Sequence, residues 1–273
     1  ISGGTFDFTK NSELLMKKSA EGSFSLTGGT YNVYDKVGVT IGSDNRLEKT
    51  GEYKQDLSVS GGTYKVDGTL KLQGQNITFD GKTIVLSGKG TLSFDGATTI
   101  SSQISWDTGK LRLADGSMDL KADVSVNEFI FGAAGALTIE KDSTLTVTSD
   151  FVMAGNSSLS GKGTLNLQGG AKATFKKLSD FGTIIAHKGE LTFAALSSVD
   201  NITIDKGTLN INGQVTVGTL VLENQAVANI TQELIVSSLN FDRGTINFAK
   251  EDSKLTLSAD STITNDASFT FAE

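Results

Sequence analysis

The chain of 273 residues carries 24 Lys and Arg against 31 Asp and Glu, and this charge of −7 argues against nucleic acid or an anionic membrane surface as its main partner. It has no Cys, which excludes a disulfide scaffold and a thiolate metal site, and its one His (His187) cannot build a His cluster. It also has no Pro, although average usage is about 5%, and strands that are hydrogen-bonded along their whole length would exclude Pro because it cannot donate to a ladder.

Short runs of alternating apolar and polar residues are the dominant pattern along the chain. Each run is bounded by Gly, Asp, Asn or Ser, and each therefore predicts a short β-strand with one apolar face. The clearest runs are Leu70–Leu72, Thr91–Phe94, Leu111–Leu113, Leu145–Val147, Leu165–Leu167, Leu209–Ile211, Val215–Val217 and Leu255–Leu257.

Two regions break this alternation. Asn11–Ala20 (NSELLMKKSA) has the apolar spacing of a helix, and we expect either one short helix or a loop excursion there. Residues 31–57 hold three of the four Tyr and a dense mix of charges, so we expect a loop or hairpin that projects from the fold. Such a projection could bind a partner, or it could be a plain long turn or a cap.

One phrase recurs with variations, and it contains a Gly-Thr, Gly-Glu or similar pair that opens a strand. The Gly of this pair lies at positions 4, 29, 62, 90, 163, 189, 207 and 244, with Gly109 and Gly135 in related phrases. The repeat is imperfect, at about 18 to 28 residues with occasional longer loops, which is the period of a solenoid.

A repeat of this length has room for about three short strands and three turns. Such strands cannot bury a one-sided apolar face alone, but stacked coils pair each strand with its equivalent in the next coil. We therefore predict an all-β parallel β-solenoid over residues 1–273, as a right-handed β-helix of triangular section with roughly eleven coils. A β-sandwich and a β-propeller are disfavoured because hairpin signals are few and blade signatures do not occur.

Outward positions on the predicted strands are polar, and stacking would align them into ladders. These positions include Thr208, Asn210, Asn212, Thr216, Thr262 and Thr264. Such ladders would at least be solvated, and they could also form a flat hydrogen-bonding face for another solenoid or a receptor.

Few residues point to catalysis. Asp107, Asp115, Asp119 and Asp123 cluster in the sequence, as do Asp200 and Asp205, but most of these sit beside turn-forming residues. His187 is interpreted as a surface turn residue rather than a general base, and Trp106 as a core or loop anchor rather than a sugar-binding platform. We therefore predict no catalytic, cofactor-binding or metal-binding residues.

The phrases SGGTYKV (60–66), SGKGTLSF (87–94), SGKGTLNL (160–167) and DKGTLNI (205–211) resemble the passenger regions of bacterial autotransporters. The resemblance spreads over most of the chain and is a style of repeat rather than a specific motif. It implies a right-handed β-helix that is exported through the outer membrane and displayed on the cell surface, and the lack of Cys fits that passage.

The resemblance further implies a structural and adhesive solenoid that mediates attachment between cells or to a host. Its partners would be a host receptor, a glycan or sister molecules, and contact with the membrane would come only through regions outside residues 1–273. Because the sequence begins at Ile1 with no signal-like segment, we expect a fragment of a longer passenger. A passive stalk and a polysaccharide-degrading β-helix enzyme remain as alternatives.

Overall fold

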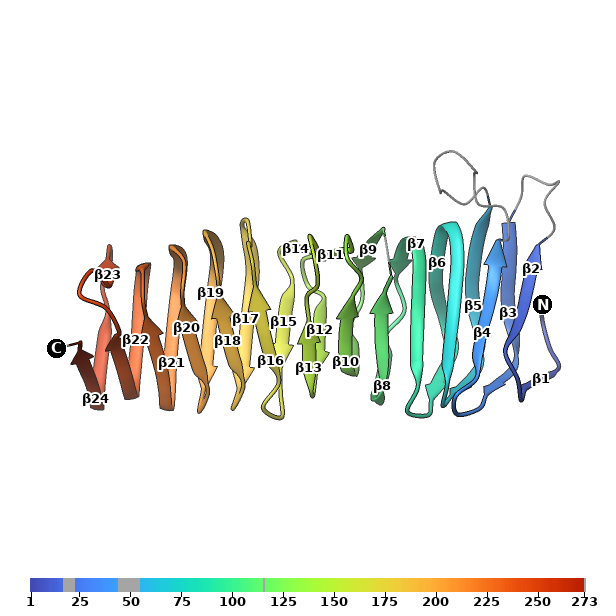
Figure 1. The fold of residues 1–273 in the computed structure, drawn as a ribbon, viewed down its shortest axis with the longest axis horizontal. Coiled ribbons are helices and arrows are strands. Elements are labelled where there is room, and N and C mark those ends of the chain that lie inside the picture. Colours follow the sequence, from blue (N-terminus) through green and yellow to red (C-terminus); the bar gives the residue numbers. More distant parts are fainter. Residues whose placement is uncertain (17–22, 44–54, 115, 273) are drawn as a thin grey trace. The chain divides into compact units, whose positions relative to one another are not determined.

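The fold was analysed in a computed structural model that describes residues 1–16, 23–43, 55–114 and 116–272. Over these residues the chain is all-β without a helix, and its parallel strands stack as a β-solenoid of about eleven turns (Figure 1). The solenoid predicted from the repeat is therefore confirmed. A search of the same residues for a helix of membrane-spanning length and hydropathy found none.

The strands divide between two compact units. Unit 1 comprises Ile1–Ser143 and Ala154–Ser157, and unit 2 comprises Thr144–Met153 and Ser158–Glu273. The strands of unit 1 are β1 (Thr5–Phe8), β2 (Ser12–Met16), β3 (Ser23–Val33), β4 (Gly38–Ser43), β5 (Asp56–Val66), β6 (Thr69–Ser87), β7 (Thr91–Ile100), β8 (Ile104–Leu113), β9 (Ser117–Leu120), β10 (Val124–Phe131) and β11 (Ala136–Ile139). Those of unit 2 are β12 (Thr144–Val147), β13 (Asp150–Val152), β14 (Ser158–Ser160), β15 (Thr164–Leu167), β16 (Lys172–Phe175), β17 (Phe181–His187), β18 (Glu190–Phe193), β19 (Ser197–Asp205), β20 (Thr208–Ile211), β21 (Val215–Ile230), β22 (Glu233–Phe248), β23 (Lys254–Leu257) and β24 (Thr262–Phe271).

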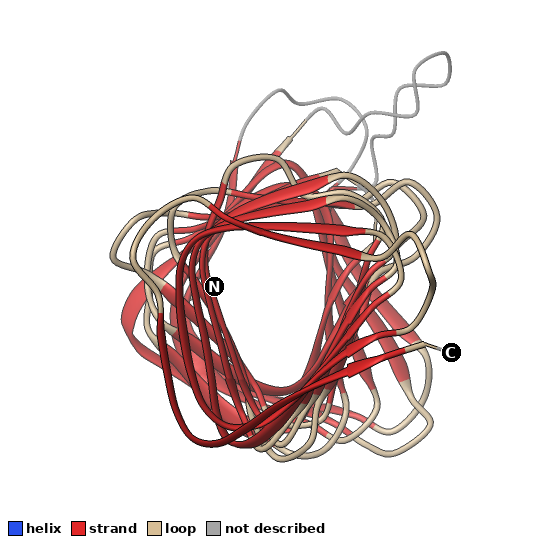
Figure 2. Ribbon diagram, turned by 90° about the vertical axis from the view of Figure 1, so that its left-hand side faces the viewer, coloured by secondary structure: helices blue, strands red, loops and turns tan. Residues whose placement is uncertain are grey.

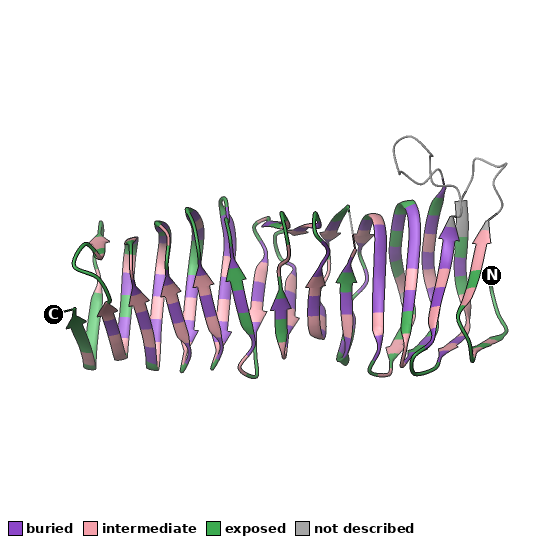
Figure 3. Cartoon of the chain, viewed as in Figure 1, coloured by how far each residue is buried: buried purple, intermediate pink, exposed green. Residues whose placement is uncertain are grey.

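Alternation along most strands separates an inner apolar face from an outer polar one, as in β12, β15 and β20 (Figure 3). All eight alternating runs singled out in the sequence lie inside strands, as predicted. Parallel pairing then places equivalent apolar residues above one another, so that each coil continues the core of the coil before it. One fully buried column of unit 2 contains Leu145, Leu165, Ile184, Ile202, Leu220 and Leu239.

The first three copies of the repeated Gly-Thr phrase mark the same position in successive coils of unit 1. Thr5 pairs with Thr30 and Thr30 pairs with Thr63, so the phrases at Ser2, Thr27 and Ser60 stack in register. The aromatic residue that follows each Thr joins an inner column in which the ring centroids of Phe6 and Tyr31 are 5.1 Å apart. Those of Tyr31 and Tyr64 are 4.8 Å apart.

A repeated corner explains the related phrases HKGELTF, DKGTLNI and DRGTINF of unit 2. The residue that follows the His or Asp adopts a left-handed backbone in each, at Lys188, Lys206 and Arg243, with φ between 51° and 59°. This conformation is uncommon outside Gly. Lys188 and Lys206 turn the chain between two strands, whereas Arg243 lies within β22, where the register with β24 shifts. Figure 2 shows that the turns of the described chain lie at the rim, outside the strands.

The two irregular regions contain strands that the sequence did not predict. Ser12–Met16 is the strand β2 and not part of a helix, and Gly38–Ser43 is the strand β4 and not part of a projecting loop. The two strands pair in parallel from Ser12↔Val39 to Met16↔Ser43, and β4 in turn pairs with β6. Residues 31–33 likewise belong to β3 and residues 56–57 to β5, and the parts of these predictions at 17–20 and 44–54 lie outside the described residues.

Candidate functional site

The outer face of unit 2 carries a row of stacked side-chain amides. Asn210 on β20, Asn229 on β21 and Asn247 on β22 occupy one register position in successive coils, and we call them the amide ladder. Asn247 Nδ2 donates to Asn229 Oδ1 at 2.9 Å, and Asn229 Nδ2 donates to Asn210 Oδ1 at 2.8 Å. The polar ladder expected at Asn210 from the sequence therefore exists.

Hydroxyl groups continue the same column beyond the three amides. Asn210 Nδ2 donates to Thr192 Oγ1 at 3.3 Å and to Glu190 Oε1 at 3.0 Å. Thr192 pairs with Thr174 on one side, and Asn247 pairs with Thr270 on the other. The result is a straight polar column whose members repeat at the strand spacing of about 4.8 Å.

The amides of the ladder keep hydrogen-bonding capacity for a partner. A side-chain amide has two N–H donors and an oxygen with two lone pairs. The contacts along the ladder use one donor and one acceptor site of Asn229, and all three side chains are half-buried rather than covered. The face can therefore bind a second molecule through amide groups whose positions are fixed in advance.

A charged cluster lies elsewhere on the surface of unit 2. Lys162 Nζ is 2.5 Å from Asp180 Oδ1 and 3.0 Å from Asp200 Oδ2, so one ammonium group joins residues of three successive coils. The hydrogen bonds to Asp180 and then to Asp200 raise the pKa of Lys162. All three side chains are well exposed, which is typical of a surface ion pair rather than a reaction centre.

His187 lies on the surface at the end of β17, as the sequence suggested. Its Nδ1 is 3.2 Å from Asp205 Oδ2, and the Nδ2 of Asn224 donates to Asp205 Oδ1 at 2.9 Å. The hydrogen bond with His187, followed by that from Asn224, lowers the pKa of the Asp205 carboxyl group. Asp200 and Asp205 lie on the same strand but have different partners.

Trp106 is a structural residue of unit 1. Its side chain is 2% exposed, and its Nε1–H donates to the Gly88 carbonyl at 2.9 Å. This burial removes the ring from solvent and confirms the anchor interpretation over a sugar-binding platform.

The Asp residues near position 115 serve separate local roles. Asp107 accepts a hydrogen bond of 2.5 Å from the Ser125 hydroxyl, and Asp119 is a half-buried residue of β9. Asp123 accepts a backbone hydrogen bond from Ile104, and Asp115 lies outside the described residues. Within the described ranges, no group of three or more His, Asp and Glu side chains is arranged to hold a metal ion.

Comparison with known proteins gave no match to a family model, to a curated protein or to a solved structure. The arguments for function therefore come from the surfaces of this chain. Sequence reasoning named Asn210 but missed Asn229, Asn247 and the contacts of Lys162 with Asp180 and Asp200. The two amide contacts and the Lys162–Asp180 contact span 18 or 19 residues, about one coil of unit 2, and the Lys162–Asp200 contact spans 38, about two coils. Such spacing is the signal that links them.

Proposed function

We propose that this chain is a structural and adhesive β-solenoid of an exported bacterial surface protein, with the character of an autotransporter passenger. The observation that carries the proposal is the amide ladder, which offers donors and acceptors in a row of half-buried side chains on the outer face. The resemblance of the repeated phrases supports the placement at the cell surface. The function is attachment, between sister cells or to a host receptor or glycan.

The physical basis of the proposed attachment is the repetition of hydrogen-bonding groups along the solenoid. A single hydrogen bond between neutral groups contributes only about 0.5 to 1.5 kcal/mol net, so one such contact cannot hold two cells together. A row of groups held at about 4.8 Å intervals by the backbone ladder lets a partner with a matching repeat form many such bonds. Because the solenoid fixes the groups before binding, little side-chain entropy is lost when the partner binds.

Beads coated with the purified chain would test adhesion directly. We expect the beads to aggregate with one another or to bind host cells or immobilised glycans. We also expect the triple variant Asn210→Ala, Asn229→Ala and Asn247→Ala to lose at least tenfold of that binding. The variant should keep the circular dichroism spectrum of the parent, because the backbone ladders do not depend on these side chains.

Asn201→Ala is the matched control. Asn201 is an exposed Asn of β19 whose Nδ2 donates to Thr183 Oγ1 at 3.3 Å, and it lies outside the amide ladder. Beads coated with this variant should bind as the parent does. Equal binding by parent and triple variant, or no binding by the parent in any of the three assays, would contradict the proposal. So would sustained release of reducing ends from a polysaccharide, which would indicate an enzyme.

A further inference from the structure

The strand pairing of unit 1 is interrupted between β6 and β8. The second half of β6, Thr83–Ser87, pairs with Gly61–Lys65 of β5 on one side. The first half of β8, Ile104–Trp106, pairs with Val124–Val126 of β10 on the side that faces away from β6. Within the residues that the structure describes, β6 and β8 share no ladder, so each presents a strand edge to the other.

Hydrogen bonds close this gap at both ends. At one end, Ser101 N–H donates to the Phe79 carbonyl at 3.0 Å and Gly81 N–H donates to the Ser102 hydroxyl. At the other end, Trp106 Nε1 and Thr108 Oγ1 donate to the Gly88 carbonyl at 2.9 and 2.7 Å. The segment from Gly81 to Gly88, at the end of β6, would be about 23 Å long at about 3.3 Å per residue. The unpaired stretch between the two strands is therefore bounded by hydrogen bonds at both ends.

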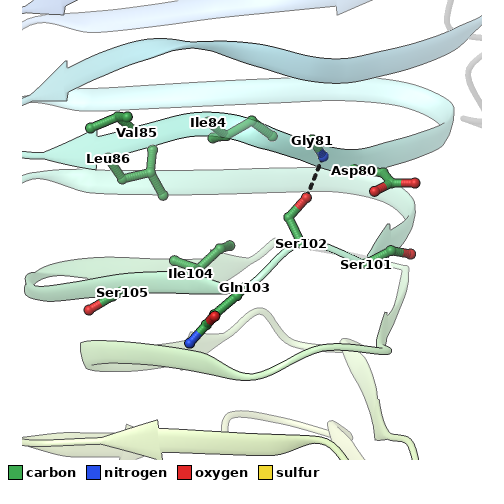
Figure 4. A pocket seen from close by; sticks show the side chains of 10 residues that line it. All are labelled: Asp80, Gly81, Ile84, Val85, Leu86, Ser101, Ser102, Gln103, Ile104 and Ser105. Carbon is green, nitrogen blue, oxygen red and sulfur yellow. Dashed lines mark hydrogen bonds between the residues drawn. The ribbon is translucent and has the colours of Figure 1, made fainter.

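The gap contains a cavity of about 710 Å³, which we call the β6–β8 groove (Figure 4). Ile84, Val85 and Leu86 line one side, and Ile104 and Ser105 line the other. A cavity of this size is in the range of ligand-binding pockets.

The apolar side chains of β6 that line the groove are more exposed than their position in the coil predicts. Leu86 stacks in register below Tyr64, which is 1% exposed, and yet Leu86 and its inward neighbour Ile84 are only half-buried. Val85, on the outer face, is 53% exposed. The inner face of the coil is therefore buried at β5 but accessible to solvent at β6.

We propose that the β6–β8 groove binds a short extended peptide segment as an added β-strand. Strand edges present backbone N–H and C=O groups in alternation, and another peptide backbone supplies their complements at the same spacing. Alternate side chains of the guest would contact Ile84 and Leu86, and the others would face solvent. None of the described residues that line the groove has an aromatic ring on which a sugar could stack.

The negative charge at one end of the groove favours one orientation of the bound peptide. Among the lining residues whose side chains the structure describes, Asp80 is the one that carries a charge, and it lies at the end where Gly81 begins the open stretch. A guest with a free amino terminus or a Lys side chain at that end gains a favourable charge contact. This inference concerns unit 1 and is independent of the adhesive function proposed for unit 2.

Residue-resolved amide hydrogen exchange tests the open edge in the protein alone. Because parallel strands direct successive residues to alternate neighbours, we expect alternate amides within Thr83–Ser87 to exchange at least a hundredfold faster than those of Gly61–Lys65 in β5. Slow exchange at all five β6 residues would mean that the edge is closed and would overturn the proposal.

Titration with a peptide tests the guest. The probe is Lys-Thr-Ile-Val-Leu-Ser with a free amino terminus, which has the sequence of residues 82–87. We expect saturable binding and slowed exchange at the fast β6 amides. The same peptide with N-methyl groups at Ile and Leu keeps its side chains and charge but loses two amide donors, and it should bind at least tenfold more weakly.

Ser105→Trp is the variant that should block the groove. Ser105 is exposed at the mouth, so an indole there fills the opening without entering the core. Binding of the peptide should fall at least tenfold. The matched control is Thr216→Trp, which places the same ring on an exposed residue of β21 that is paired on both sides, and binding should be unchanged.

Two further outcomes would overturn the proposal. If the parent protein does not bind the probe, the open edge does not accept a strand. If the N-methylated peptide binds as well as the probe, the groove is an apolar pocket without strand pairing. Because exchange is measured on the unmodified protein, a folding defect in Ser105→Trp leaves the proposal testable.

Discussion

Tyr64 shows how a single residue is adapted to the inner column of a solenoid. Its ring is 1% exposed and stacks on Tyr31, and its hydroxyl donates to the Gly61 carbonyl at 2.9 Å. Burial, and then the neighbouring Tyr31, raise the pKa of Tyr64 far above the usual value for tyrosine, because a phenolate would be poorly solvated there.

The raised pKa predicts a loss of stability in alkali. The unfolded chain loses the Tyr64 proton near pH 10, whereas the folded chain retains it. The contribution of Tyr64 is therefore complete below about pH 10 and declines as the pH rises toward the folded pKa. Thermal melts from pH 8 to 11.5 should show a fall in melting temperature that is smaller in Tyr64→Phe than in the parent.

At neutral pH the Tyr64→Phe variant should lose about 1 kcal/mol, because the Gly61 carbonyl loses its donor. Tyr34→Phe is the control, since the Tyr34 side chain is 50% exposed. Its melting profile should follow that of the parent at every pH. Identical alkaline profiles for Tyr64→Phe and the parent would show that Tyr64 ionisation is not coupled to folding.

At the scale of the element, the strands could be predicted from the sequence wherever alternation was clean. The runs at Leu145–Val147 and Leu209–Ile211 became β12 and β20, because one side of each strand has the stacked core beneath it. The strand β2 was missed because Glu, Leu and Met in Ser12–Met16 are good helix formers. Pairing with β4 overrides that local preference.

The register between coils could not be predicted in the same way. The Gly of the recurring phrase is separated by anything from 18 to 37 residues in unit 2, so the partner of a given outward residue is not fixed by counting. Asn210 was recognised as outward-facing, but its contact with Asn229 depends on a pairing 19 residues away. The β6–β8 groove is likewise invisible in the sequence, because the apolar run Ile84–Leu86 reads as an ordinary buried strand and does not show which neighbour is missing.

Close stacking of coils makes some corner positions intolerant of a side chain. Gly132, which follows β10, donates from its N–H to the Leu113 carbonyl at 2.6 Å, and a Cβ atom there would lie 1.4 Å from the Ala114 carbonyl oxygen. Backbone cannot rotate away as a side chain can, so the coils would have to separate locally. Gly132→Ala should lower the free energy of unfolding by about 1 to 3 kcal/mol, measured by urea denaturation.

Gly3→Ala is the matched control for this substitution, because nothing lies within 4 Å of a Cβ built at Gly3. Its free energy of unfolding should stay within about 0.5 kcal/mol of the parent value. A Gly132→Ala variant as stable as Gly3→Ala would show that the corner is not closely packed.

At the scale of the whole molecule, stability is a sum over coils. In a solenoid each coil contacts only its neighbours, so stability is approximately the sum of local terms and neighbouring interfaces. The last strand illustrates this dependence, because Ile263, Phe269 and Phe271 of β24 remain 48%, 39% and 68% exposed with a coil on one side only. Equivalent apolar residues between two coils, such as Ile202 and Leu220, are fully buried.

A cavity inside one coil should therefore act locally. Leu220 of β21 is fully buried and lies between Ile202 of β19 and Leu239 of β22, so Leu220→Ala should cost about 2 to 5 kcal/mol. Hydrogen exchange should accelerate strongly in β19, β21 and β22 and much less in β5 and β6 of unit 1. Thr219→Ala, at the neighbouring half-buried outward position, should change neither region measurably. An equal acceleration in both units after Leu220→Ala would mean that the chain unfolds as one cooperative body, contrary to the coil-by-coil stability expected here.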